Sequence, residues 1–327
     1  MRGRSRREFL QTSAAAAAFT SIPGLALAEE AWPSRPIRLI VGFTPGTATD
    51  ITARLFATGA SDTLGQQVVV EDRPGAGSAL AAGFVARAPK DGYTLFIATT
   101  SVITGQAMKP DPGFDLTRDF APVSLLATGA VVLVASPQSG LKSVADVIAL
   151  AKAKPNEVLC ANVGVGSAPH FAAVLFAQRA GIKLVHVPYP GSPQAVNDLL
   201  AGRVAIFFSP ASTVIGHIAA GKIAALATAA EQRAKALPNV PSMAEAGMPN
   251  FDTSLWFGIL APSGTPRGAI DKVAAAAGKA MQAPAAVDSM SKQGFVPIGN
   301  SADKFGAYLT AEIKRWAAVA HSAGVKT

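Results

Sequence analysis

The residues with the clearest chemical potential form a tight turn in "VGFTPGTATDITARL" (residues 41–55), between an apolar run and an amphipathic segment. A Pro-Gly pair favours a turn, and Gly46 permits unusual backbone angles. Thr47 and Asp50 have the spacing of a capping box, so we expect a helix to begin at Ala48. A helix N-terminus presents unpaired N–H groups and about half a positive charge, and the small residues of this first turn would let an anion reach the backbone.

The same strand–turn–helix pattern occurs twice more. "VGVGSAPH" (residues 163–170) follows one apolar run, with Ser167 as a cap candidate, and "RPGAGSAL" (residues 73–80) follows another. If the first turn and the 163–170 turn face each other across a cleft, each can hold one carboxylate of a small diacid. The alternative is that these glycines, serines and prolines only build the tight turns that any α/β protein needs.

Individual side chains in these turns also have two interpretations. Asp50 is either a capping residue or a ligand contact, and Arg54 has the i,i+4 spacing to pair with it. His170 could donate to a ligand or bond to nearby backbone at the helix start. Arg73 is expected to stabilise its own loop.

Catalytic and cofactor motifs are missing from the sequence: there is no G-x-S-x-G, H-E-x-x-H, C-x-x-C or G-x-x-x-x-G-K-[ST]. "GAGSAL" and "GVGSAP" begin like a dinucleotide loop but lack its third glycine and its later acidic residue. His186, His217 and His321 lie apart in the chain and indicate no metal site. We therefore expect no enzyme, cofactor or metal, and only Ser167 with His170 offers a local pair that a hydrolase could use.

The elements that must position these turns follow from the hydrophobic pattern. Apolar, β-branched runs alternate with Ala-rich amphipathic segments, which is typical of β/α units and largely parallel sheets. We expect strands at residues 37–43, 68–72, 94–98, 123–127, 131–135, 158–161, 184–187, 204–208, 224–228 and 255–261. Residues 169–180, 266–282 and 302–322 predict helices, and "FVPIG" predicts a short strand.

Two long apolar runs, residues 119–137 and 253–266, have the character of crossings between lobes. Two crossings divide the chain into a discontinuous outer lobe (29–125 plus 256–327) and an inner lobe (126–255). We therefore expect an α/β fold of two lobes. A cleft between two domains is a common place for a ligand site.

Composition indicates a folded, exported protein, with 50% hydrophobic and 15% charged residues. Residues 1–28 combine Arg6 and Arg7, a short apolar stretch and a small-residue site, which predicts a Tat-type signal peptide cleaved after Ala28 rather than a membrane anchor. This segment holds four Arg and one Glu, so cleavage lowers the formal charge from +8 to +5. The remaining Lys and Arg are scattered, which argues against nucleic acid as a partner. Cys160, the single cysteine, is expected to be buried.

A family resemblance rests on ordered motifs. They include "WPSRPIRLIVGFTPGTATDITARL", "VVVEDRPGAGSALAAGFVARAPKDGYTL", "DFAPVSLLAT", "GSAPHF", "VHVPYPGSPQAVNDLLAGRV", "LPNVPSMAEAGMPNFD" and "WFGILAPSGTP". From Trp32 to the C-terminus the chain resembles the Bug-type extracytoplasmic solute-binding proteins of tripartite tricarboxylate transporters. The resemblance implies a type II periplasmic-binding-protein fold, with two lobes, two hinge strands and a carboxylate held between loops by N–H groups, hydroxyls and water.

The resemblance also implies a set of ligand-binding residues. Carried over to this chain, they are Phe43, Thr44, Pro45, Gly46, Thr47, Ala48, Asp50, Thr100, Ser101, Gly166, Ser167, Pro169, His170, Tyr189, Pro190, Gly191 and Ser209.

The chain departs from the family pattern at two points. Gly46-Thr47 replaces a common double glycine, so Thr47 either narrows the pocket or adds a hydrogen bond. Ser209-Pro210 stands where many members have an acidic or amide residue. This second departure favours a simple carboxylate over an amino acid as ligand.

The expected function is periplasmic capture of a small organic carboxylate or dicarboxylate by a monomer, followed by delivery to membrane permease subunits. A ligand-sensing receptor that docks on a sensor kinase or regulator is the alternative. Uptake and ligand-induced transcription, measured after deletion of the protein, separate these two functions.

Overall fold

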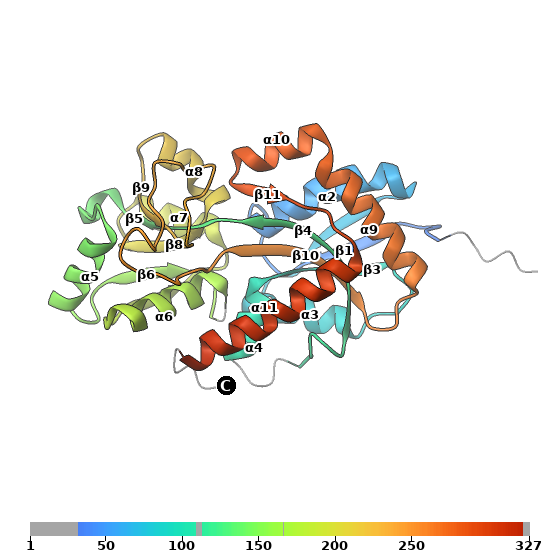
Figure 1. Cartoon of the computed structure of the whole chain (residues 1–327), viewed down its shortest axis with the longest axis horizontal. Coiled ribbons are helices and arrows are strands. Elements are labelled where there is room, and N and C mark those ends of the chain that lie inside the picture. Colours follow the sequence, from blue (N-terminus) through green and yellow to red (C-terminus); the bar gives the residue numbers. More distant parts are fainter. Residues whose placement is uncertain (1–31, 109–112, 166, 323–327) are drawn as a thin grey trace, which may run out of the picture.

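Two β-sheets form from the apolar, β-branched runs of the sequence, because such residues favour strands and here pack on both faces. The computed structural model describes residues 32–108, 113–165 and 167–322. Each sheet is covered by helices, and the two layered units lie side by side as two lobes (Figure 1). We call the unit with the first strand lobe 1 and the other lobe 2. The expected signal peptide, residues 1–28, lies outside the described residues.

The lobe 1 sheet has the strand order β11-β4-β10-β3-β1-β2. Its strands are β1 (Ile37–Val41), β2 (Val68–Asp72), β3 (Thr94–Thr99), β4 (Phe120–Gly129), β10 (Leu255–Pro262) and β11 (Phe295–Pro297). The lobe 2 sheet has the order β7-β6-β8-β5-β9. Its strands are β5 (Val131–Ala135), β6 (Leu159–Asn162), β7 (Val185–Pro188), β8 (Ile206–Pro210) and β9 (Ala224–Thr228).

The helices follow the strands in β/α order. Around lobe 1 they are α2 (Ala48–Leu64), α3 (Ala79–Ala86), α4 (Thr100–Met108), α9 (Arg267–Gln282), α10 (Pro284–Lys292) and α11 (Ala302–Ser322), with the short η1 (Ala76–Ser78) before α3. In lobe 2 they are α5 (Val144–Ala153), α6 (Ala168–Ala180), α7 (Ser192–Leu200) and α8 (Ala211–Ala219), with η2 (Pro137–Ser139) before α5. None of the described helices has both the length and the apolar character needed to span a bilayer.

The expectation of largely parallel sheets is wrong. Strands β1, β2 and β3 pair in parallel, and so do β6, β7 and β8, but β10, β4 and β11 join lobe 1 antiparallel, and β5 and β9 join lobe 2 antiparallel. The physical reason is the passage of the chain between lobes. The strands that enter a lobe, β10 in lobe 1 and β5 in lobe 2, run opposite to their neighbours β3 and β8 of the β/α units. Strand β4, which leaves lobe 1, pairs antiparallel with β10 and so runs in the same direction as β3.

The two crossings take the chain from one sheet to the other. The first occurs at Ala130, between the last residue of β4 and the first residue of β5, and the second occurs in the segment that precedes β10. In Figure 1, β4 and β10 run side by side between the lobes. The domain boundaries expected at 125/126 and 255/256 stay a prediction.

A third connection comes from the C-terminal helix. Helix α11 packs on β4 and α4 of lobe 1 and reaches lobe 2 through Trp316. The ring of Trp316 contacts the ring of Phe171 of α6 edge-on, with 5.1 Å between the ring centroids. Both rings are fully buried. Cys160 is likewise buried, as expected, and burial raises the pKa of its thiol to about 12.

Candidate functional site

Five of the described helices, α2, α4, α6, α7 and α8, start around one small cavity between the lobes. The cavity has a volume of about 30 Å³, room for one or two waters or a carboxylate group. Its walls come from residues 43, 47–49, 99, 101, 163, 169, 192, 210, 255 and 257, and we call it the inner cavity. Because each helix start carries partial positive charge, the inner cavity favours an anion without a cationic side chain.

The start of α2 is built as its sequence predicts. Thr47 is the N-cap residue, and its Oγ1 accepts from the backbone N–H of Asp50 at 3.4 Å. Gly46 has a left-handed backbone (φ 77°), and its N–H donates to Asp50 Oδ2 at 2.9 Å. In the part of the chain that the structure describes, the N–H groups of Ala48 and Thr49 have no hydrogen-bond partner. These two groups are available to a ligand in the inner cavity.

The carboxylate of Asp50 is bonded to other groups of the protein. Its side chain is 5% exposed, and Oδ1 lies 2.7 Å from Arg54 Nε, as the i,i+4 spacing predicts. Arg54 also reaches Asp72 at 3.2 Å. The hydroxyl of Thr47 is similarly used, since it donates to the Thr44 carbonyl at 2.9 Å while it caps α2. The capping interpretation of Asp50 agrees with these bonds.

The lobe 2 wall of the inner cavity is tied directly to lobe 1. The backbone N–H of Ala168, the first residue of α6, donates across the cleft to Ser101 Oγ at 3.0 Å. Ser167 caps α6 and accepts from the His170 N–H at 3.3 Å. A Cβ on Gly191, the N-cap of α7, would collide with Thr44 Oγ1 of lobe 1. The two lobes are therefore in contact at the turns that border the site.

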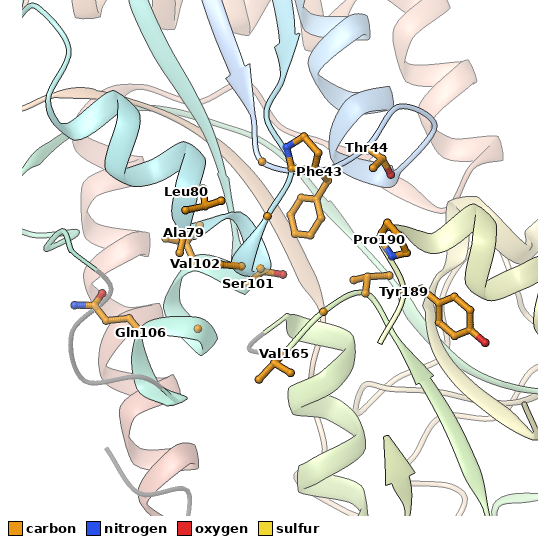
Figure 2. Close-up of a pocket in the computed structure, with 18 of the residues that line it drawn as sticks. Phe43, Thr44, Ala79, Leu80, Ser101, Val102, Gln106, Val165, Tyr189 and Pro190 are labelled. Carbon is orange, nitrogen blue, oxygen red and sulfur yellow. The ribbon is translucent and has the colours of Figure 1, made fainter. Parts of the chain in front are cut away.

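A larger pocket of about 610 Å³ adjoins the inner cavity, and we call it the outer pocket. Both lobes line it, through residues 42–44, 74–77, 79–80, 101–102, 105–106, 114, 163–165 and 189–190. Phe43, Ser101 and Val163 border both spaces, so the two form one site. Figure 2 shows Phe43 and Leu80 from lobe 1 on one side and Val165 and Pro190 from lobe 2 on the other.

Some of the expected site residues line these two spaces. Among the residues that the family resemblance indicates, the lining members are Phe43, Thr44, Thr47, Ala48, Ser101, Pro169, Tyr189 and Pro190. Tyr189 lines the outer pocket with its backbone. Its ring points away from the pocket (Figure 2), and its hydroxyl donates to Asp198 at 2.8 Å. Burial, followed by this bond to Asp198, raises the pKa of the Tyr189 phenol to about 12.

Other expected site residues lie in the surrounding shell and line neither space: Pro45, Gly46, Asp50, Thr100, Ser167, His170, Gly191 and Ser209. Thr100 Oγ1 accepts from the backbone N–H of Trp256 at 3.2 Å and so ties α4 to β10. Ser209 Oγ lies 2.8 Å from Thr213 Oγ1 in the same lobe. Gly166 lies outside the described residues. Direct contact of these residues with a ligand stays a prediction.

The pair Ser167 and His170 does not have the geometry of a nucleophile and its base. Ser167 Oγ is bonded to the backbone N–H of His170, while the His170 ring packs edge-on against His186 at 4.8 Å. Burial, followed by the charge of His186, lowers the pKa of His170 to about 4. Burial also lowers the pKa of His186. Both imidazoles are uncharged at neutral pH and supply no cation.

The 73–80 turn forms one wall of the site, although the sequence did not lead us to predict that it binds ligand. The 73–80 turn was recognised as a third strand–turn–helix start, yet residues 74–77, Ala79 and Leu80 were not assigned to the pocket. This turn has the same glycine-rich strand–turn–helix pattern as the two turns that were assigned to the site. The structure adds strain as a second signal, because Ala76 and Ser78 have φ values of 48° and 82°, which non-glycine residues rarely adopt.

The fold and the site together define a two-lobed binding protein with a cleft ligand site. Comparison with known families agrees: the family model for the tripartite tricarboxylate transporter family receptor matches residues 52–325. The chain therefore belongs to this family of solute-binding receptors. Because the family and its fold are those of binding proteins, the chain is not an enzyme. Within the described residues, no three His, Cys, Asp or Glu side chains are grouped to hold a metal ion.

Individual relatives show the same likeness. Protein BugT of Bordetella pertussis is 37% identical over 94% of this chain and 96% of its own length. Among solved structures, an R. palustris protein with adipate has a TM-score of 0.85 at 33% identity, covering 90% of this chain and 98% of that one. MatC from Rhodopseudomonas palustris with bound malate has a TM-score of 0.85 at 29% identity, covering 88% and 100%.

Proposed function

We propose that this receptor captures a small organic carboxylate in the periplasm, with the carboxylate in the inner cavity, and presents it to the membrane permease of its transporter. The convergence of five helix starts on the inner cavity carries the proposal. The unpaired N–H groups of Ala48 and Thr49 and the hydroxyls of Ser101 and Ser192 supply donors there. The adipate and malate of the similar structures support the same ligand class.

The decisive experiment places a carboxylate in the cavity permanently. Thr49 is 5% exposed, lines the inner cavity and lies in the first turn of α2, where an acidic residue suits the helix dipole. Thr49→Asp should keep its melting temperature but lose carboxylate binding, because the new side chain occupies the anion position. Thr58→Asp, on the exposed face of the same helix, makes the same charge change away from the site and should bind normally.

Binding is measured with the mature protein by calorimetry and by thermal shift against butanoate, hexanoate, adipate and malate. An acid at 100 times its Kd should stabilise the protein by about 2.7 kcal/mol. Binding of the neutral amides of these acids in preference to the acids, or undiminished binding by Thr49→Asp, would reject an anion site in the inner cavity.

We also propose that residues 1–28 are a Tat-type signal peptide cleaved after Ala28, and that the mature receptor is a monomer. The twin arginines support the export route. Replacement of Arg6 and Arg7 by Lys should leave the protein in the cytoplasmic fraction. Mass spectrometry of the periplasmic protein determines its N-terminus, and light scattering determines its mass in solution.

A further inference from the structure

The walls of the outer pocket are more apolar than the binding of a dicarboxylate requires. Its walls are formed mainly by Phe43, Leu80, Val102, Phe114, Val163 and Val165, together with glycines, alanines and prolines. Among the residues that the structure describes, no Asp, Glu, Lys, Arg or His lines either the outer pocket or the inner cavity. The described residues of the site therefore offer no ionised side chain to a ligand; five helix starts border the inner cavity, and the start of α3 borders the outer pocket.

Two exposed hydrophobic side chains lie at the rim of this pocket, one on each lobe. Leu80 of α3 is 64% exposed, and Val165 of the turn before α6 is 67% exposed. Figure 2 shows them on opposite sides of the space. Most large apolar side chains among the described residues are buried, so Leu80 and Val165 are exceptions, and they place exposed apolar surface on both walls of the same pocket. An apolar ligand body between the lobes would remove both side chains from water.

Among the described residues, few polar side chains in the outer pocket could hold a second carboxylate. Tyr189 directs its hydroxyl to Asp198, outside the pocket. Ser101 Oγ lies at the junction with the inner cavity, where it bonds to Ala168. Gln106, half-buried, and Thr44 are the other polar side chains of the wall. An ionised carboxylate moved into such surroundings loses its hydration without a cation to replace it.

We propose that this receptor selects monocarboxylates with an apolar body and about six or more carbons in total. Their carboxylate occupies the inner cavity and their hydrocarbon portion fills the outer pocket, and the receptor discriminates against dicarboxylates of the same length. The proposal rests on the proposed function, because it needs the carboxylate in the inner cavity. The cavity of about 610 Å³ falls within the range of roughly 300–1,000 Å³ that pockets for larger organic ligands occupy.

Matched acid pairs test the proposal on the mature protein by calorimetry. Hexanoate and adipate have the same carbon chain, as do octanoate and octanedioate, and each pair differs only in the second carboxylate. We expect each monoacid to bind at least about tenfold more tightly than its diacid. From butanoate to octanoate, affinity should rise about fourfold per added methylene, until the outer pocket is filled.

The outcomes separate this inference from the proposed function. If the diacids bind as tightly as the monoacids or more tightly, the selectivity is overturned while carboxylate capture stands. If affinity does not rise along the monoacid series, the outer pocket does not hold the chain and the inference fails as well. If no acid binds, or Thr49→Asp binds normally, the proposed function itself fails.

A reversal of selectivity supplies the second test. Val165→Lys and Leu80→Lys each place an ammonium group at the pocket rim, at exposed positions where folding does not depend on the side chain. Each variant should bind hexanoate more weakly and adipate more tightly than the parent. Val69→Lys, at a 41% exposed position on β2 outside the pocket, makes the same charge change as a control and should leave both affinities unchanged. An equal hexanoate-to-adipate ratio in parent, Val165→Lys and Leu80→Lys would overturn the proposal.

Discussion

Replacement of Ser101 by alanine should weaken ligand binding because it removes the hydrogen bond that joins the two lobes at the site. Ser101 Oγ accepts from the N–H of Ala168 at 3.0 Å, borders both the inner cavity and the outer pocket, and is 3% exposed. When the lobes are apart, water can bond to the Ala168 N–H. When they close on an alanine instead, this N–H is buried without a partner.

The magnitude follows from this difference between the open and closed forms. A buried donor left without a partner costs about 1–3 kcal/mol, which corresponds to an affinity loss of about 5- to 150-fold. The substitution should change the free energy of unfolding by less than it changes the free energy of binding, because in the open form of the variant the Ala168 N–H stays solvated. The Ser101→Ala effect should therefore appear mainly in binding and closure.

Ser124→Ala is the matched control. Ser124 is fully buried in lobe 1 and donates from Oγ to the Asn300 carbonyl at 2.7 Å, away from the cleft. It should lose about 1 kcal/mol of stability and keep its affinity. Calorimetry with hexanoate and adipate measures binding, urea denaturation measures stability, and small-angle X-ray scattering measures closure. If Ser101→Ala binds like the parent, the interlobe bond does not support the closed form.

Three further changes have defined outcomes. Gly191→Ala should hinder closure and weaken carboxylate binding, and Thr44→Ala in the same chain should restore it, because the new Cβ collides with Thr44 Oγ1, whereas Thr44 Cβ at 3.5 Å and the flexible Gln194 side chain at 3.3 Å can be accommodated. Failure of this rescue in calorimetry would contradict the steric account. The pKa of His170 is about 4 in the folded protein, below the ordinary 6.5, so the unfolded chain binds protons first and stability should fall as pH drops from about 6.5 towards 4. Melting temperatures between pH 4.5 and 7.5 measure this slope, and His170→Gln should flatten it; an unchanged slope would refute the assignment. Asp50→Asn should lower stability by about 1–2 kcal/mol in urea denaturation, because it removes the charge paired with Arg54 and weakens the cap of α2, whereas an unchanged midpoint would show that the ion pair contributes nothing.

Much of the local structure could be predicted from the sequence. The bounds of β2, β5, β9 and α11 agree with the expected residue ranges, and Thr47 caps α2 as its spacing from Asp50 predicts. These features depend on residues close together in the chain, whose side-chain patterns and capping preferences act locally. The antiparallel pairing of the crossing strands was not predicted, since no local pattern records which lobe a strand enters.

The site divides in the same way. The sequence by itself determined that helix starts rich in small residues follow the strands, and hence that the chain can bind an anion without cationic side chains. Only the tertiary structure decided that five of these starts surround one cavity, that the 73–80 turn forms a wall, and that Tyr189 turns its hydroxyl to Asp198. It also decided that Ser101 meets Ala168 across 67 positions of sequence. Such contacts depend on how two separately folded sheets dock, and docking is set by the packing of whole surfaces rather than by neighbouring residues.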